Sequence, residues 1–558
     1  MPRRRPHARR RTPVPLLDAA VVIVLGVPLF LLGLLGGRPD PSRPVTAQAS
    51  GAGATRAPDD GSAGTSSPPD GTPQPGTSAP EPSEPGAALE DTAVVPVTHF
   101  RSAVAATGFD EARAVLEGTS KRYEALELVE ADADGILAAL GTSRPAEASR
   151  LVLARDAEQL AEDLAENRER LAFLRAEDIT PAVRAIAWGG ASMFGVDRVG
   201  SAADWPLRAS LPARSASPSA YDPGAAWTLV AGGDIMLDRG VYQAIEVEGK
   251  GVDFPWNGGT AEITSRYCCS SFGWELPVTE RTGNEGAVRR LIEGADISIA
   301  NFENPAPNEF SWHTRGTVFT ADPKLIDGLV NAGIDYVSLA NNHIRDAGGQ
   351  GILETIENLE KRGLRYSGAG EDIDAARAPA VLEAGGVQVA ILGYDAIAAA
   401  YAAGEGRVGS APLSAAACRA DVRKARDAGA DVVIVFPHWG VEYDATPFDG
   451  QQGVARACLD AGADMIIGNH AHWAGAMEVY EGKPIWYALG NFVFDQTWSE
   501  PTMEGITLEL TFSGGDLRQV RMRPHIILDK AQPNFLDAGG DGRVVMKQVF
   551  GEDELLPW

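Results

Sequence analysis

Four of the eight histidines in this sequence stand in short polar clusters, each directly after a run of apolar residues. They are His343, His438, His470 and His472. A single residue separates His470 from His472, so on an extended segment both rings point to the same side. Imidazole nitrogens combined with carboxylate and amide oxygens suit Mn, Fe, Zn or a related divalent ion. Any one of these histidines is more simply explained as a buried core residue, but the set taken together predicts a metal site.

Oxygen ligands occur in the same kind of position, because Asp234, Glu303 and Asn342 also follow apolar runs. The runs are short and rich in β-branched residues and alternate with amphipathic helical patterns, which predicts an α/β fold. Loops beyond the carboxyl ends of strands converge in such folds, so we expect these side chains to share one site. The predicted strands are residues 228–231, 297–300, 336–340, 387–392, 432–436, 465–467 and 485–488.

Six ordered segments of this region resemble the poly-γ-glutamate capsule biosynthesis protein CapA family. They read GGDIMLDR, IANFENP, VSLANNHIRDAGGQGILET, VFPHWGVEY, IIGNHAHW and WYALGNFVFDQ. That family belongs to the calcineurin-like metallophosphoesterase superfamily. The resemblance implies a domain over residues 226–530 with a four-layer αββα sandwich of the metallophosphoesterase type, and a site at the strand ends.

The resemblance also implies which residues bind metal. The first motif of the superfamily reads Asp-x-His, and here it reads Asp234-Ile235-Met236, so this histidine ligand is absent. Glu303 corresponds to the bridging carboxylate. One implied half-site contains Glu303, Asn342, His438 and His470. The other contains Asp234, Glu303 and His472 and is one ligand short, so one or two divalent ions are expected.

If the site is catalytic, the ion would activate water for attack on a phosphorus or acyl centre. His343, next to the implied ligand Asn342, would be the general acid for the leaving group, oriented by Asp346. Arg239 would pair with anionic oxygens of the substrate. Two alternatives stay open: Asp346 caps a helix that begins near Gly348, and Arg239 forms a surface ion pair. Four further residues either support the site or have structural roles: Glu442, Tyr443, Asn491 and Asp495.

The N-terminal segment predicts a membrane anchor. Residues 1–15 contain six arginines and no acidic residue, and residues 19–37 contain no charged residue. The apolar length matches the ~20 residues that cross a bilayer, and the basic flank places the N-terminus in the cytoplasm. We therefore expect a basic cytoplasmic tail at 1–15, a single transmembrane helix at 16–37 and the rest of the chain outside the cell. A cleaved signal peptide ending at Ala47-Gln48-Ala49 is the alternative.

Three further regions lie outside residues 226–530. Residues 38–91 are dominated by Pro, Gly, Ser and Thr, which predicts a disordered linker. Residues 94–211 alternate helical and apolar patterns and predict a small α/β accessory domain. This domain is similar to one lobe of a phosphate-type periplasmic binding protein, and a spacer or docking domain is the alternative. Residues 531–558 are expected to form a C-terminal extension.

The four cysteines do not predict a disulfide framework in a chain of 558 residues. Cys418 and Cys458 lie in Ala-rich helical patterns and are expected to be small buried apolar residues. The adjacent Cys268 and Cys269 have no assigned role, and no Cys-x-x-Cys spacing predicts a thiolate zinc site. Three tryptophans in long insertions are expected either to pack in the core or to line a polymer groove: Trp256, Trp274 and Trp312.

The charge balance narrows the possible functions. With 49 Lys and Arg against 76 Asp and Glu, the net charge of −27 excludes nonspecific binding to nucleic acid. The N-terminal segment and the family resemblance together imply a membrane-anchored, metal-dependent hydrolase of phosphoester type that acts on a phosphoester or an anionic polymer during capsule synthesis. The alternative is a noncatalytic, metal-containing component of a membrane complex for polymer synthesis or export. A solute-binding or sensor protein led by residues 94–211 is a third hypothesis, although no residue there demands a ligand.

Overall fold

The strands predicted to carry the histidines lie in two separate β-sheets. The computed structural model describes residues 88–214 and 220–551. The predicted tail, the predicted membrane segment and nearly all of the predicted linker fall in residues 1–87, outside the described residues. Within the described ranges, no helix is both long enough and apolar enough to cross a membrane.

The first sheet has ten strands in the order β11-β10-β26-β25-β24-β9-β12-β13-β14, and β23 also pairs with β9. Strands β9, β12, β13 and β14 are parallel, so their carboxyl ends meet at one edge. The bounds are β9 Trp227–Ile235, β10 Thr260–Tyr267, β11 Leu276–Gly283, β12 Ile297–Phe302, β13 Tyr336–Ser338, β14 Arg365–Ser367, β23 Asn491–Val493, β24 Glu504–Ser513, β25 Asp516–Leu528 and β26 Gln532–Phe535.

The second sheet has six strands in the order β16-β17-β19-β20-β22-β21. Its central strands β17, β19, β20 and β22 are parallel. The bounds are β16 Ala380–Ala384, β17 Val387–Asp395, β19 Val432–His438, β20 Met465–Ile467, β21 Met477–Tyr480 and β22 Lys483–Trp486. A small separate sheet pairs β15, Ala369–Gly370, with β18, Gly409–Ser410.

Apolar side chains fill the space between the two sheets. In β9, Leu229 and Ala231 belong to this central cluster, whereas Val230 belongs to the cluster on the opposite face. This alternation is the period of a strand whose two faces are both buried. Val389 and Ile434 contribute from the second sheet. Each fully buried side chain of this size stabilises the fold by about 1.5–3 kcal/mol, so the central cluster holds both sets of strand ends in fixed positions.

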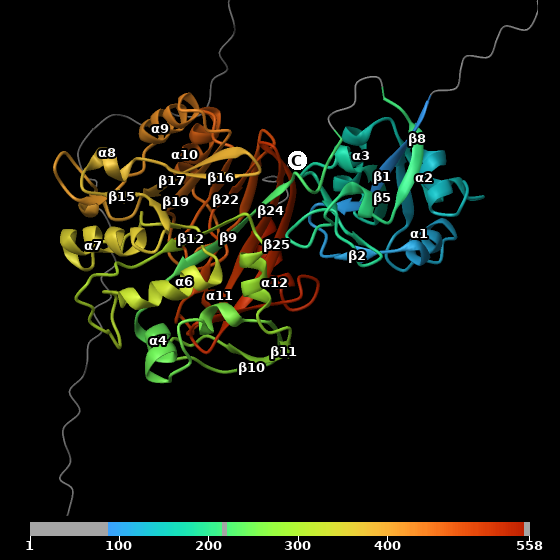
Figure 1. Cartoon of the computed structure of the whole chain (residues 1–558). Helices are drawn as coiled ribbons and strands as arrows, with labels where there is room; N and C mark the ends of the chain where they lie inside the picture. Colours follow the sequence, from blue (N-terminus) through green and yellow to red (C-terminus); the bar gives the residue numbers. More distant parts are fainter. Residues whose placement is uncertain (1–87, 215–219, 552–558) are drawn as a thin grey trace, which may run out of the picture. The chain divides into compact units, whose positions relative to one another are not determined.

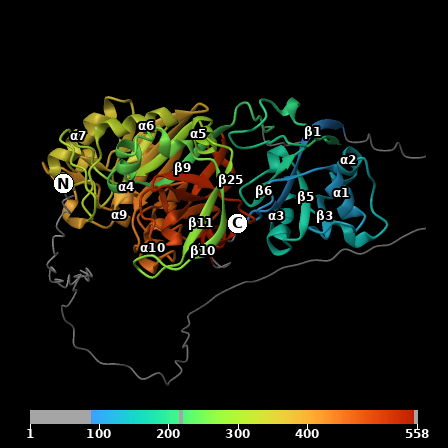
Figure 2. The same cartoon turned by 90° about the horizontal axis from the view of Figure 1, so that it is seen from below.

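Helices cover the outer faces of both sheets and complete four αββα layers. Helices α5, α6 and α7 contribute to the apolar cluster on the first sheet, and Figure 2 shows α5 and α6 beside β9. Helices α9 and α10 cover the second sheet, next to β17 and β19 in Figure 1. The bounds in this domain are α4 Arg239–Tyr242, α5 Ala287–Glu293, α6 Ile326–Ala332, α7 Gly348–Glu360, α8 Ile373–Ala376, α9 Ala415–Asp427, α10 Asp449–Asp460, α11 Glu500–Met503 and α12 Arg543–Phe550.

All seven predicted strands are present, with differences at their ends. Strands β9 and β17 continue to Ile235 and Asp395, whereas β22 ends at Trp486, two residues before the predicted end. The hairpins β10–β11 and β24–β25 were not predicted. The domain also continues past residue 530, because β26 pairs with β25 and α12 buries Val545 and Val549 in the central cluster. Most of the predicted C-terminal extension is therefore part of the fold.

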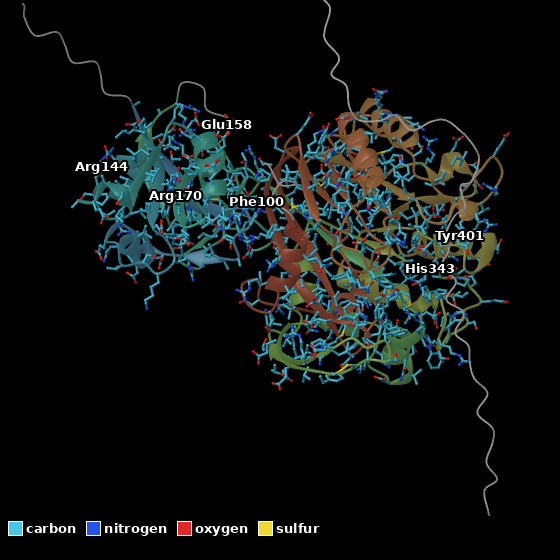
Figure 3. The ribbon with its side chains drawn as sticks, turned by 180° about the vertical axis from the view of Figure 1, so that it is seen from behind. Phe100, Arg144, Glu158, Arg170, His343 and Tyr401 are labelled. Atoms are coloured by element: carbon cyan, nitrogen blue, oxygen red, sulfur yellow. A yellow bond between two sulfur atoms is a disulfide. The ribbon has the colours of Figure 1, made fainter. Side chains whose placement is uncertain are left out.

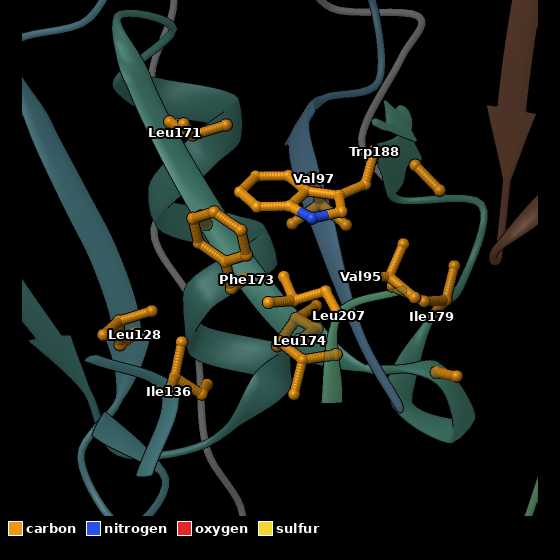
Figure 4. Close-up of a cluster of buried hydrophobic side chains, with 14 of the residues drawn as sticks. Val95, Val97, Leu128, Ile136, Leu171, Phe173, Leu174, Ile179, Trp188 and Leu207 are labelled. Carbon is orange, nitrogen blue, oxygen red and sulfur yellow. The ribbon is translucent and has the colours of Figure 1, made fainter. Parts of the chain in front are cut away.

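A second, smaller α/β region precedes this domain, as the sequence predicts. Its sheet has the order β4-β3-β5-β1-β6, with β8 also paired to β1. Figure 4 shows its core, where Phe173 and Trp188 lie in edge contact among Val95, Val97 and Leu128. The bounds are β1 Leu89–His99, β2 Ala106–Thr107, α1 Phe109–Leu116, β3 Ala125–Val129, α2 Ala133–Ala139, β4 Leu151–Ala154, α3 Ala157–Glu166, β5 Arg170–Arg175, β6 Val183–Ala185, β7 Ala187–Trp188 and β8 Arg208–Pro212.

The boundaries of this region differ from the predicted 94–211 by a few residues. Strand β1 begins at Leu89, inside the range predicted as linker. The reason is local: Leu89 to Ala93 pair with β8 from Pro212 back to Arg208, which gives this polar start of the strand a hydrogen-bonded partner.

Cys418 and Cys458 are buried, as predicted, but they also form a disulfide between α9 and α10, which corrects the prediction that they are simply apolar residues. Cys268 and Cys269 are likewise disulfide-bonded to each other. The sequence could not reveal the first bond because its cysteines are 40 residues apart and meet only after the two helices pack.

We expect the Cys418→Ala/Cys458→Ala variant to lose up to about 4 kcal/mol of unfolding free energy, because the bond restricts a long loop in the unfolded chain. Denaturant unfolding of the variant and of the Cys268→Ala/Cys269→Ala control, which closes almost no loop, measures this. If an alkylating agent reacts with four thiols in the unreduced wild-type protein, neither disulfide bond is present.

Candidate metal centre

The carboxyl ends of both sheets bring the predicted metal-binding residues into one cluster. Asp234 is near the end of β9, Glu303 follows β12 and His438 ends β19. The remaining residues lie in loops: Asn342 after β13, and His470 and His472 after β20. Asp234 and Glu303 are completely buried, and the three histidines of the second sheet are nearly so.

Glu303, His438 and His470 form the first half of this cluster. Their potential ligand atoms all lie within 4.8 Å of one another. His438 Nε2 lies 3.5 Å from Glu303 Oε1 and 3.1 Å from His470 Nδ1. Asn342 Oδ1 lies 2.8 Å from the same His438 nitrogen. The structure thus brings together the four residues that the resemblance implies for one half-site.

Asp234, Glu303 and His472 form the second half, again with potential ligand atoms within 4.8 Å of one another. His472 Nδ1 lies 3.5 Å from Asp234 Oδ2, and its Nε2 lies 3.8 Å from Glu303 Oε1. Met236, where the sequence resemblance implies a histidine, accepts a hydrogen bond at its sulfur from the backbone N–H of Asp238. Glu303 is the residue that the two halves share.

Glu303 provides the test of whether a cation fits here. Both of its carboxylate oxygens are buried, and neither has a hydrogen-bond partner among the described residues. Burial, followed by the charges of Asp234 and Glu442, raises the pKa of Glu303 well above its usual value. A buried carboxylate without a partner is costly, and a bound cation removes that cost. The donor set of carboxylates, imidazoles and one amide therefore fits a divalent metal ion.

The histidines of the cluster are suited to the same role because they are neutral near pH 7. Burial is the largest cause of the lowered pKa values of His470 and His472, each to about 3. Burial and the neighbouring histidines hold the pKa of His438 well below its usual range. A neutral imidazole has a free nitrogen lone pair for a cation.

Three site residues have a backbone conformation that non-glycine residues rarely adopt. The φ angles are 94° at His470, 56° at His472 and 46° at Arg239. Left-handed backbone at such residues costs of order 1–3 kcal/mol each and persists where the surrounding fold imposes it. Such strain is common at functional sites, although this chain also has it at Asn284, Glu481, Asp529 and Lys530.

His343 and Asp346 lie together beside the cluster, and Figure 3 labels His343. His343 donates a hydrogen bond from Nδ1 to Asp346 Oδ2 at 2.9 Å, and the same oxygen accepts from the backbone N–H of Phe319. Helix α7 begins at Gly348 without a side-chain cap. Asp346 therefore orients His343 and does not cap the helix.

Arg239 is in a half-buried ion pair and not on the surface. Its guanidinium pairs with Asp495, donates to the carbonyl of Gly316 at 2.9 Å and lies 4.6 Å from the ring centre of Phe319. Its Nε is buried and has no hydrogen-bond partner in the part of the chain that the structure describes. Asp495, predicted either to line the site or to close a turn, thus positions Arg239.

Other predicted neighbours also reach the cluster. Asn491 Oδ1 lies 2.9 Å from His472 Nδ1. The ring of Tyr443 stacks 6.0 Å from that of His472. Trp256 is buried in the core, as ordinary packing predicts, whereas Trp312 is 37% exposed and donates from its indole to the carbonyl of Arg239.

Two interactions beside the cluster could not be read from the sequence. Asn301 donates to Asp234 Oδ1 at 2.7 Å, and the same amide nitrogen lies 3.2 Å from His438 Nδ1. Asp238 is completely buried and accepts from His313 Nδ1 at 2.6 Å. Asn301 stood inside a selected polar cluster, but no sequence signal connects Asp238 to a histidine 75 residues away.

We expect Asn301→Ala to weaken metal binding by about 10–100-fold, because Asn301 holds one carboxylate and one imidazole of the cluster in place. Titration of the metal-free protein with Mn²⁺ measures the affinity. Asn358→Ala removes a buried asparagine of α7 that contacts Ala306 and Asn308, and serves as the control. An equal loss in both variants would show that Asn301 only stabilises the fold.

Comparison with known proteins places this cluster in a described family. A model of the bacterial capsule synthesis protein PGA_cap family matches residues 228–496, which include every clustered residue. The capsule biosynthesis protein CapA of Bacillus anthracis is 34% identical over 233 residues, which cover 40% of this chain and 57% of that protein. A probable polyglutamine synthesis accessory protein of Mycobacterium tuberculosis is 30% identical over 293 residues, covering 48% of this chain and 74% of that protein. The solved structure of the calcineurin-like phosphoesterase YfkN from Bacillus subtilis matches at 14% identity with a TM-score of 0.31, covering 58% of this chain and 94% of that one.

Proposed function

The chain belongs to the bacterial capsule synthesis protein PGA_cap family, and from this premise we propose that it is a divalent-metal-dependent hydrolase of phosphoester type. Its sandwich would then be of the metallophosphoesterase type. The observation that carries the proposal is Glu303, a fully buried carboxylate. Its two oxygens have no hydrogen-bond partner within residues 88–214 and 220–551, and they face histidines from the second sheet. A site built only for stability has no use for such a group.

The residues divide into a binding set and a proton-transfer set. Glu303, Asn342, His438 and His470 would hold one ion, and Asp234, Glu303 and His472 would hold a second. A bound divalent ion supplies positive charge that polarises a phosphoryl oxygen and lowers the pKa of water.

His343 would donate the proton that the leaving group needs. Asp346 accepts a hydrogen bond from Nδ1 of His343. Nε2 is therefore the nitrogen that can donate a proton to the oxygen of the leaving group. Arg239, oriented by Asp495, would bind an anionic oxygen of the substrate.

The setting of this activity is also a proposal. One relative is named a capsule biosynthesis protein, and another is named a probable polyglutamine synthesis accessory protein. We infer that this chain acts in the synthesis of a poly-γ-glutamate-like or other polyanionic polymer, as a partner in a membrane complex. The arginine-rich start and the uncharged segment 19–37 support a single membrane anchor with the rest of the chain outside the cell.

One observation favours a second candidate function, a noncatalytic metal-containing component of a complex for polymer synthesis or export. The half-site of Asp234 has His472 but lacks the further histidine that the resemblance implies at position 236, where the sulfur of Met236 contacts the backbone of its own loop. A single ion held by the other half-site would suffice to bind polymer carboxylates.

Hydrolysis of a phosphodiester by the full-length protein, with Mn²⁺ or with a chelator, tests the proposal. We expect turnover that requires metal. A protein that binds metal stoichiometrically but hydrolyses no phosphoester would contradict the proposed hydrolase activity. It would favour the proposed noncatalytic role in polymer synthesis or export.

A further inference from the structure

A cavity of about 440 Å³ shares no lining residue with the metal cluster. Six of its lining residues carry or can carry positive charge, and none of its lining residues is an aspartate or glutamate: the six are His99, Arg101, Arg168, Arg184, Arg543 and Lys547. The chain as a whole has a net charge of −27. A cavity lined by one sign of charge, opposite to that of the whole protein, concentrates ligands of the other sign.

Contacts that do not involve the positively charged side chains hold the walls of this cavity in position. The described residues belong to one compact unit. Gln519 of β25 accepts from the backbone N–H of Ala185 at 2.6 Å and donates to the carbonyl of Val183 at 2.9 Å, on either side of Arg184 in β6. The ring of Phe100, labelled in Figure 3, lies 5.9 Å from that of Phe550 at the end of α12.

Three of these cations have no acidic partner among the described residues. No ion pair in the described ranges includes Arg184, Arg543 or Lys547. Arg184 donates only to a neutral acceptor, the carbonyl of Val104. Neighbouring arginines differ: Arg521 pairs with Asp197 and Arg523 with Glu509. The cavity therefore retains positive charge, whereas Arg521 and Arg523 are neutralised by acidic partners.

The electrostatics inside the cavity are unfavourable without an anion. Burial, then repulsion by the arginines of β25, lowers the pKa of Arg184 to about 10. Burial, then repulsion by three arginines, lowers the pKa of His99 to about 4, and the buried Nδ1 of His99 has no hydrogen-bond partner among the described residues. A bound anion relieves both effects.

We propose that this cavity is an anion-binding site, separate from the metal centre, whose ligand is a compact molecule with at least two carboxylate or phosphate groups. Guanidinium forks match both oxyanions, and the volume lies within the range of small-molecule sites. A single carboxylate would leave part of the positive charge of Arg184, Arg543 and Lys547 uncompensated. The residues are scattered from His99 to Lys547, so no local motif reveals them.

The acidic end of the chain is the competing occupant. Glu552, Asp553 and Glu554 directly follow Gly551, which lines the cavity. The test therefore includes a variant in which these three carboxylates are replaced by amides.

Calorimetric titration of the full-length Glu303→Gln protein, treated with a chelator, isolates this site from any metal-bound anion. The probes are inorganic pyrophosphate and hexaglutamate, each at low and high salt. We expect saturable binding that weakens with salt, and a Kd at least about tenfold higher in Arg543→Gln/Lys547→Gln, because each lost charged hydrogen bond costs about tenfold or more.

Both substituted side chains are exposed on α12, so the variant should fold. Arg144→Gln, at an exposed arginine labelled in Figure 3, is the control.

Binding of pyrophosphate alone assigns a phosphate ligand, and binding of hexaglutamate alone assigns a polycarboxylate ligand. Either result supports the proposal if the Arg543→Gln/Lys547→Gln variant binds that probe more weakly. Unchanged affinity in the double variant, no binding of either probe at millimolar concentration, or binding only after the tail carboxylates are removed would overturn it. Because metal is absent throughout, none of these outcomes depends on the proposed hydrolase.

Discussion

Glu303→Gln is expected to have opposite effects on stability with and without metal. In the metal-free protein the substitution removes a buried, unpartnered carboxylate, so unfolding free energy should rise by about 1–3 kcal/mol. With Mn²⁺ at about 100 times its Kd, the wild-type protein gains about 2.7 kcal/mol, and the variant should gain almost none because it loses the ligand common to both half-sites. Thermal unfolding with and without Mn²⁺ measures both effects.

Glu504→Gln is the matched control for this experiment. Glu504 is also buried, one of its oxygens also lacks a hydrogen-bond partner, and burial raises its pKa to about 8. It belongs to neither half of the cluster. The control should keep the full stabilisation by Mn²⁺. If Glu303→Gln also keeps it, Glu303 is not a metal ligand.

His343→Ala should reduce phosphodiester turnover by about 10²–10⁴-fold while metal binding stays intact, because the residue would supply a proton and not a ligand. The loss should depend on the leaving group. A nitrophenolate leaves readily without a proton, so its ester should be affected far less than an alkyl ester. Steady-state kinetics with the two esters, together with metal analysis of the variant, measure this difference.

His313→Ala is the control for His343→Ala. The ring of His313 also forms a hydrogen bond with an aspartate, Asp238. His313 belongs to neither group of potential metal ligands among the described residues. We expect turnover within about threefold of wild type. An equal loss with both leaving groups in His343→Ala would mean that His343 positions the site and does not donate the proton.

The parallel strands and their ligands could be predicted because both signals are local. A short β-branched run followed by a polar cluster specifies a buried strand and the side chains at its end, as for β12 and Glu303 or β19 and His438. The convergence of these ends then follows from the general geometry of α/β sheets.

The remaining features depend on contacts that no local pattern encodes. Asp238 meets His313, Asn301 meets His438, and Cys418 meets Cys458 only after the sheets and helices have packed. The hairpin β24–β25 is different, because Leu508 and Leu510 alternate with Glu509 in a readable period of two. That alternation carries no chemical motif, so the hairpin was not predicted although it lies inside residues 226–530.

The metal centre is tested most directly by anomalous scattering from crystals of the full-length protein grown with Mn²⁺. Our account predicts a Mn peak within coordination distance, about 2–2.3 Å, of Glu303, His438 and His470. A second peak beside Asp234 and His472 would show that both half-sites bind an ion. The absence of any peak at Glu303 in metal-replete crystals would contradict the account.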